Sequence, residues 1–128
     1  MTKMMNVFAS VWLATGSALA SFGSAHGGEV EIVKASARGS GTTYSFDVTL
    51  RHGDEGWDHY ANIWEVLAPN GDILGTRVLY HPHVDEQPFT RSLSGVEVPA
   101  ELTHVMIRAG DKLHGMSEKL FRVELEAR

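Results

Sequence analysis

Histidine is the residue type whose number and spacing first suggest chemistry in this sequence. The chain of 128 residues has seven histidines and no cysteine. Five of the histidines fall in three polar stretches between apolar segments, at His52, His59, His81, His83 and His114. Neutral imidazole is the commonest protein ligand for metals such as zinc, copper, iron and nickel, and carboxylates can complete such a site. The spacing therefore predicts a metal centre built from loops.

Carboxylates accompany the histidines in these stretches. Asp111 precedes His114 by three residues, and residues 81–85 read His-Pro-His-Val-Asp, ending at Asp85. Two histidines that flank a proline can bind one ion only if the loop turns both rings inward. His104 differs from these, because it alternates with apolar residues inside a predicted strand. We expect His104 on the surface, on the face opposite the core.

Short β-strands must position these loops. Tyr44, Phe46, Val48 and Leu50 alternate with polar residues, which is typical of a half-buried strand. Similar runs predict six more strands, at residues 29–37, 60–67, 73–80, 89–98, 104–109 and 119–126. The Asn-Gly pair at residues 70–71 predicts a hairpin turn. About seven strands without a helical period predict an all-β protein, an immunoglobulin-like β-sandwich that has no disulfide.

The first 25 residues have the composition of an export signal. Lys3 is the only charged residue before Glu29, and a run of apolar and small residues follows it. A basic start, an apolar stretch of about 7–15 residues and an exit of small residues define a secretory signal peptide. Cleavage after Ala20 or after Ala25 fits the small-x-small rule, and the second removes more apolar residues. We therefore expect a signal peptide at 1–25 and a sandwich domain at 26–128, periplasmic or secreted.

The charge balance limits the classes of partner. The formal net charge is -5 and no basic stripe is present. These properties argue against nucleic acid and against an anionic membrane surface as partners of the cleaved domain. A Gly-x-Ser-x-Gly motif and a glycine-rich phosphate loop are also missing from the sequence. A small molecule or another protein remains open as the partner.

Two segments resemble superoxide reductases and desulfoferrodoxins. Residues 58–66, Asp-His-Tyr-Ala-Asn-Ile-Trp-Glu-Val, are similar to the family's His-Tyr-Ile-x-Trp-Ile-Glu segment, and His52 is placed like another family histidine a few residues upstream. Residues 108–115, Arg-Ala-Gly-Asp-Lys-Leu-His-Gly, are similar to the family's Arg-x-Tyr-Cys-Asn-x-His-Gly segment. The resemblance implies an immunoglobulin-like sandwich in which His52, His59 and His114 lie together as ferrous-iron ligands.

The sequence departs from this family at the cysteine ligand, where it has Asp111. An axial thiolate donates electron density to iron and tunes its potential, and a carboxylate does not supply the same soft donation. The lysine beside the family's glutamate is also absent, because residues 53–57 read Gly-Asp-Glu-Gly-Trp. The resemblance therefore implies a remodelled iron site, with copper or zinc as alternatives, and argues against superoxide reduction itself. His81 and His83 have no counterpart in the family and form a second candidate set of ligands.

Copper binding at the mature N-terminus is another interpretation. Cleavage after Ala25 would expose His26, whose α-amine and imidazole can chelate one copper ion together. This arrangement resembles the N-terminal histidine brace of copper proteins. Such a brace needs a further histidine, for which His83 or His114 is suitably placed in a loop.

A binding or structural module without a metal is the remaining interpretation. In that case Trp57, Trp64, Tyr80 and Phe89 are core or interface aromatics, and the His-Pro-His stretch is a rigid turn. Glu86 and Arg91 would then form a buried pair that anchors the loop. Turn residues in this loop are able to cap backbone amides, which supports the interpretation.

Overall fold

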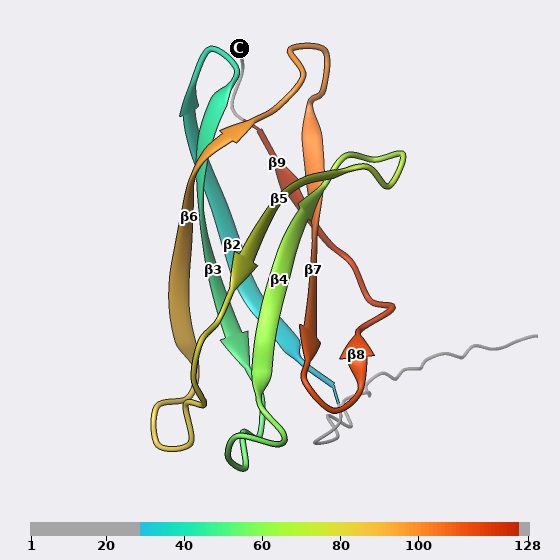
Figure 1. Ribbon diagram of the computed structural model, residues 1–128. Coiled ribbons are helices and arrows are strands. Elements are labelled where there is room, and N and C mark those ends of the chain that lie inside the picture. The colour runs from blue at the N-terminus through green and yellow to red at the C-terminus, as the bar shows by residue number, and fades with distance from the viewer. Residues whose placement is uncertain (1–28, 126–128) are drawn as a thin grey trace, which may run out of the picture.

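The computed structural model describes residues 29–125, which fold into two antiparallel β-sheets that face each other (Figure 1). The first sheet has the order β2-β3-β6, and the second has the order β5-β4-β7-β8 with β9 also paired to β7. The strands are β2 (Glu31–Ser40), β3 (Thr43–Arg51), β4 (Ala61–Leu67), β5 (Ile73–Val78), β6 (Phe89–Glu97), β7 (His104–Asp111), β8 (Gly115–Met116) and β9 (Phe121–Glu124). The predicted all-β sandwich is confirmed. The predicted signal peptide, its two cleavage positions and His26 lie outside the described residues.

Each predicted strand overlaps a strand of the structure, but β8 was not expected. The prediction ended the sixth strand at Ala109, whereas β7 continues to Asp111 because its last two residues pair with β8. The close approach of these two strands needs a glycine. A Cβ atom at Gly110 would lie 2.7 Å from the carbonyl oxygen of Gly115. The Asn-Gly turn is confirmed, with Gly71 at a φ of 99°.

The core fills the space between the sheets with the residues that the period-two pattern selects. Phe46, Val48 and Leu50 of β3 are fully buried, and Trp64 of β4 and Ile107 of β7 are fully buried as well. Burial of side chains of this size contributes about 1.5–3 kcal/mol each relative to exposure. Because the chain has no cysteine, this packing supplies the stability that a disulfide would otherwise add.

Strand register brings three loops to one end of the sandwich, the lower end in Figure 1. Asp111 at the end of β7 pairs with Ala61 at the start of β4. Phe89 at the start of β6 pairs with Leu50 near the end of β3. The loop of residues 52–60, the loop of residues 79–88 and the β7–β8 hairpin therefore meet there. Among residues 29–125 we find no helix with the length and apolar character needed to cross a membrane.

Candidate metal centre

Three residues predicted to bind a metal lie together at this end of the sandwich. Nε2 of His52 lies 3.0 Å from Oδ2 of Asp111, and Nε2 of His59 lies 3.4 Å from the same oxygen. One ligand atom from each of the three side chains lies within 4.8 Å of the other two. His52 and Asp111 are buried, and the side chain of His59 is 12% exposed. This distance range allows one ion to contact all three residues.

Carboxylates on the far side of the rings decide which nitrogen of each histidine faces the centre. Nδ1 of His52 lies 2.6 Å from Oδ1 of Asp54, and Nδ1 of His59 lies 2.8 Å from Oε1 of Glu55. A carboxylate can only accept a hydrogen bond, so Nδ1 of each ring carries the proton. In the neutral imidazole the other nitrogen is then a bare lone pair. In that neutral form each Nε2 points an electron pair at Asp111. When His52 is doubly protonated, its Nε2 instead donates a hydrogen bond to Oδ2 of Asp111.

When both histidines are neutral with the proton on Nδ1, neither Nε2 atom faces a hydrogen-bond donor. Nε2 of His59 is buried and has no hydrogen-bond partner. Two imidazole lone pairs facing one carboxylate oxygen repel each other unless a cation or additional protons lie between them. A hydrogen bond to Glu55 raises the pKa of His59, so the surroundings of this ring favour its positively charged form. A bound metal cation would supply this positive charge as well.

Asp111 is held as an anion inside the protein. Burial by itself raises the pKa of Asp111, but hydrogen bonds from the backbone and ring of His114 and from His52 lower it below the usual value. Ring atom Nδ1 of His114 lies 3.0 Å from Oδ2 of Asp111. The side chain of His114 is 49% exposed, and its ring centroid is 5.0 Å from that of His59. His114 therefore lies at the solvent-facing rim of the centre.

A tight turn within the 52–60 loop presents His59. Gly56 adopts a φ of 128°, a region that favours glycine, and Gly56 and His59 form an isolated β-bridge. The amide of His59 donates to the carbonyl oxygen of Gly56 at 3.2 Å, and the amide of Glu55 donates to that of His59 at 2.8 Å. Trp57 stands at the tip of this turn and is 60% exposed. The turn directs His59 back toward Asp111.

His83 occupies a different environment from the three converging residues. Its ring stacks on Phe89, with a centroid distance of 3.9 Å, and Arg91 donates a hydrogen bond to its Nε2 at 2.7 Å. Burial lowers the pKa of His83, and the charge of Arg91 acts in the same direction. Neutral His83 must then carry its proton on Nδ1. Since Arg91 occupies one nitrogen and a proton the other, neither is available to a metal in this conformation.

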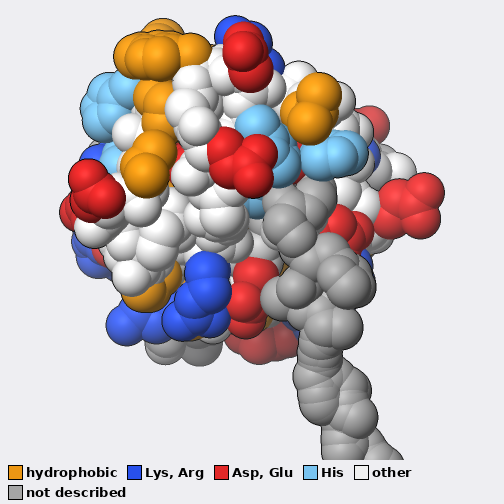
Figure 2. Space-filling model, turned by 90° about the horizontal axis from the view of Figure 1, so that it is seen from below, with side chains coloured by type: hydrophobic (Ala, Val, Ile, Leu, Met, Phe, Trp, Pro, Cys, Tyr) orange, Lys and Arg blue, Asp and Glu red, His pale blue; other side chains and the backbone are white. Residues whose placement is uncertain are grey.

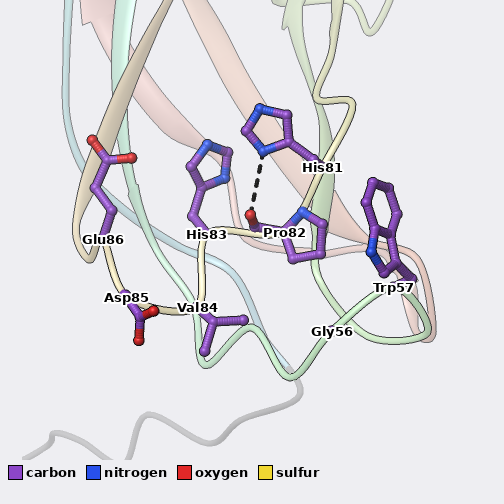
Figure 3. A pocket seen from close by; sticks show the side chains of 8 residues that line it. All are labelled: Gly56, Trp57, His81, Pro82, His83, Val84, Asp85 and Glu86. Atoms are coloured by element: carbon purple, nitrogen blue, oxygen red, sulfur yellow. Dashed lines mark hydrogen bonds between the residues drawn. The ribbon is translucent and has the colours of Figure 1, made fainter.

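His81 lies beside His83 on the opposite side of the Pro82 turn (Figure 3). The two ring centroids are 4.7 Å apart, and Nδ1 of His81 lies 3.3 Å from the carbonyl oxygen of Pro82. The structure does not bring His81, His83 or Asp85 into the group formed by the other ligands. An open cleft of about 500 Å³ is lined by Gly56, Trp57 and residues 81–86. The cleft and the metal centre share no residue.

The remaining predictions from the sequence have mixed outcomes. His104 is half-buried in β7, where it alternates with buried Val105 and pairs with Glu124, as expected for the outer face. The predicted buried pair is partly wrong, because Arg91 and Glu86 are 3.7 Å apart with side chains 30% and 63% exposed. Trp64 and Phe89 are core residues. Trp57 and Tyr80 are exposed.

Asp54 is a site residue that was not among the ligands predicted from the sequence. Its side chain is fully buried, between the ring of His52 and the loop that carries His83. The available signal was its position two residues after a candidate ligand, because metal-binding histidines commonly donate their second ring proton to a carboxylate.

The face that carries the centre also has acidic side chains around the histidines and separate apolar patches (Figure 2).

The chain shares sequence similarity with a protein from Halomicrobium mukohataei named "Putative lipoprotein". The two are 42% identical over 87 residues, which are 68% of this chain and 42% of that protein. The chain therefore spans less than half the length of this relative. No family model matches the chain. No solved structure matches it either.

Proposed function

We propose that this chain is an exported protein that binds one divalent transition-metal ion. The ligands are Nε2 of His52, Nε2 of His59 and a carboxylate oxygen of Asp111, with His114 as a fourth ligand from the rim. The observation that carries the proposal is the convergence of two Nε2 atoms on one buried carboxylate oxygen, with a second carboxylate at Nδ1 of each ring. Groups of this kind bind metals because the carboxylate at Nδ1 keeps the proton there and leaves Nε2 to the ion.

Iron is the metal that the donor set favours. Two histidines and one carboxylate with open positions are the ligands of many mononuclear non-haem Fe(II) sites. The resemblance to superoxide reductases groups His52, His59 and His114 around iron as well. Zinc and copper are alternatives, because imidazole and carboxylate ligands also suit these ions.

The proposed role is metal binding, without superoxide reduction. Asp111 stands where the resemblance would require a thiolate, and the described residues contain no cysteine. Without the soft sulfur donor, the metal has only nitrogen and oxygen ligands, which alter its potential. The open side of the centre lies near half-exposed His114, where water or a small ligand can reach the ion.

Export is supported by two independent features. The N-terminal sequence fits a secretory signal peptide. The relative from Halomicrobium mukohataei has a name that describes a lipoprotein, which is an exported class of protein. We propose that the present protein is exported too, and that its domain acts outside the cytoplasm.

Elemental analysis of untagged protein, isolated from the exported fraction of its native cells, tests this function. We expect about one equivalent of metal per chain, with iron in excess of zinc and copper. His59→Ala is expected to lose that metal, and the matched variant His104→Ala is expected to retain it. Metal content below a tenth of an equivalent in protein that also fails to bind Fe(II), Zn(II) or Cu(II) afterwards would contradict the proposal.

A further inference from the structure

Asp54 connects the proposed metal centre with the loop that forms the neighbouring cleft. Oδ1 accepts hydrogen bonds from Nδ1 of His52 at 2.6 Å and from the amide of Ala61 at 3.0 Å. Oδ2 accepts a hydrogen bond from the amide of His83 at 2.7 Å. The carboxylate thus has three donors and a side chain with no exposed surface. These contacts join two loops that are distant in sequence.

We propose that Asp54 is a positioning residue that couples metal binding at His52 to the conformation of the 81–86 loop. The inference rests on the proposed function, because it requires a metal at Nε2 of His52. By keeping the proton on Nδ1, Asp54 leaves Nε2 free to bind the ion. Through its other oxygen, Asp54 fixes the backbone at His83, which lines the cleft opposite Trp57 (Figure 3).

The direction of coupling follows from the strength of these hydrogen bonds. An imidazole bound to a metal cation is a stronger N–H donor than a free one, so metal binding strengthens the bond from His52 to Asp54. When the position of the Asp54 carboxylate is fixed more firmly, the His83 amide that is bound to it moves less. Because linkage is reciprocal, a ligand that fixes the cleft loop must increase metal affinity by the same factor. The cleft therefore responds to metal occupancy.

An asparagine at this position cannot make the same contacts. Its single carbonyl oxygen can face either His52 and Ala61 or His83, and its NH₂ group must face the other side. In the first orientation the NH₂ group opposes the amide of His83, donor against donor. In the second orientation it faces Nδ1 of His52, so that ring must place its proton on Nε2 and lose the metal-binding lone pair.

The test uses Zn(II) as a diamagnetic probe and follows amide hydrogen exchange at His83 by NMR in the mature protein. We expect Zn(II) to slow this exchange by about fivefold or more. Asp54→Asn is expected to weaken Zn(II) binding by about 10–100-fold and to abolish the response at His83. In the metal-free variant, ¹⁵N shifts should show the proton of His52 on Nε2 in part of the molecules. Asp58→Asn, an isosteric change at an exposed position of the same loop, should alter none of these quantities.

The outcomes separate this inference from the proposed function. If Zn(II) binds the unmodified protein but exchange at His83 is unchanged, the coupling is wrong and the metal centre stands. If Zn(II), Fe(II) and Cu(II) all fail to bind, the proposed function is wrong and the coupling falls with it. Should Asp54→Asn fail to fold, the exchange measurement on the unmodified protein still decides the inference.

Discussion

Nε2 of His52 and Oδ2 of Asp111 lie 3.0 Å apart in the buried end of the sandwich. At this separation the two atoms need a proton or a cation between them, because each presents an electron pair to the other when His52 is neutral with its proton on Nδ1. The same oxygen lies 3.4 Å from Nε2 of His59. In the proposed centre, this contact places Asp111 between the two histidine ligands.

Replacement of Asp111 by cysteine tests whether residue 111 reaches the metal. Asp111→Cys places a thiolate at the position where the superoxide reductase resemblance has one. After loading with Fe(II) and oxidation, we expect this variant to show a visible sulfur-to-iron charge-transfer band that the unmodified protein lacks. Asp58→Cys, at an exposed position in the 52–60 loop, is the matched control and should remain without the band. An iron-loaded but colourless Asp111→Cys protein would place residue 111 outside the coordination sphere.

Metal affinity should depend strongly on pH. Ligation requires neutral imidazole, and histidine has an ordinary pKa of about 6.5. The hydrogen bond to Glu55 raises the pKa of His59, so protons begin to compete with the metal at a higher pH. We expect the affinity for Zn(II) to fall by about tenfold per pH unit for each proton displaced, as the pH drops through this range. Calorimetric titrations between pH 8 and pH 5.5 measure this, and a constant affinity would contradict histidine ligation.

The free energy of unfolding of the metal-free protein should also depend on pH through His83. Burial lowers the pKa of His83, with Arg91 and His81 acting in the same direction and Glu86 and Asp54 opposing them. The unfolded chain therefore binds more protons than the folded one between the two pKa values. The stability that neutral His83 contributes is complete above about pH 6.5 and is lost as the pH falls through the folded pKa.

Urea unfolding of the metal-free protein at a series of pH values measures this contribution. His83→Gln should reduce the loss of unfolding free energy at acidic pH, whereas His104→Gln, the same change at a histidine of β7, should leave it unchanged. His59 acts with the opposite sign, since a raised folded pKa gives stability below about pH 6.5 that is lost as the pH rises. Parallel pH curves for the unmodified protein and His83→Gln would contradict the assignment of His83.

Local patterns in the sequence predict much of the fold. Alternating burial in Tyr44, Phe46, Val48 and Leu50 follows directly from a side-chain period of two. The turn at Asn70-Gly71 follows from the backbone freedom of glycine. The two-residue strand β8 has no such pattern, because it exists only through its pairing with the end of β7.

The sequence predicts the site only in part. It shows which residue types can bind a metal, but the surroundings of each residue depend on tertiary structure. The loop histidines His52 and His59 and the carboxylate of Asp111 are visible as chemistry in the sequence. Their grouping depends on the register of β4 against β7, which pairs Ala61 with Asp111. The hydrogen bond from Arg91 that occupies His83 also depends on tertiary packing. Sequence spacing alone therefore leaves His83 and His59 equally plausible as ligands.

The most direct test of the metal centre is an NMR titration of the histidine ring nitrogens with Zn(II), using long-range ¹H–¹⁵N correlation. We expect Nε2 of His52 and Nε2 of His59 to shift to values for metal-bound nitrogen at one equivalent of Zn(II), while Nδ1 of both rings keeps its proton. His81, His83 and His104 should keep the ring nitrogen signals of their metal-free state. Unchanged Nε2 signals for His52 and His59 in the presence of bound Zn(II) would contradict the proposed centre.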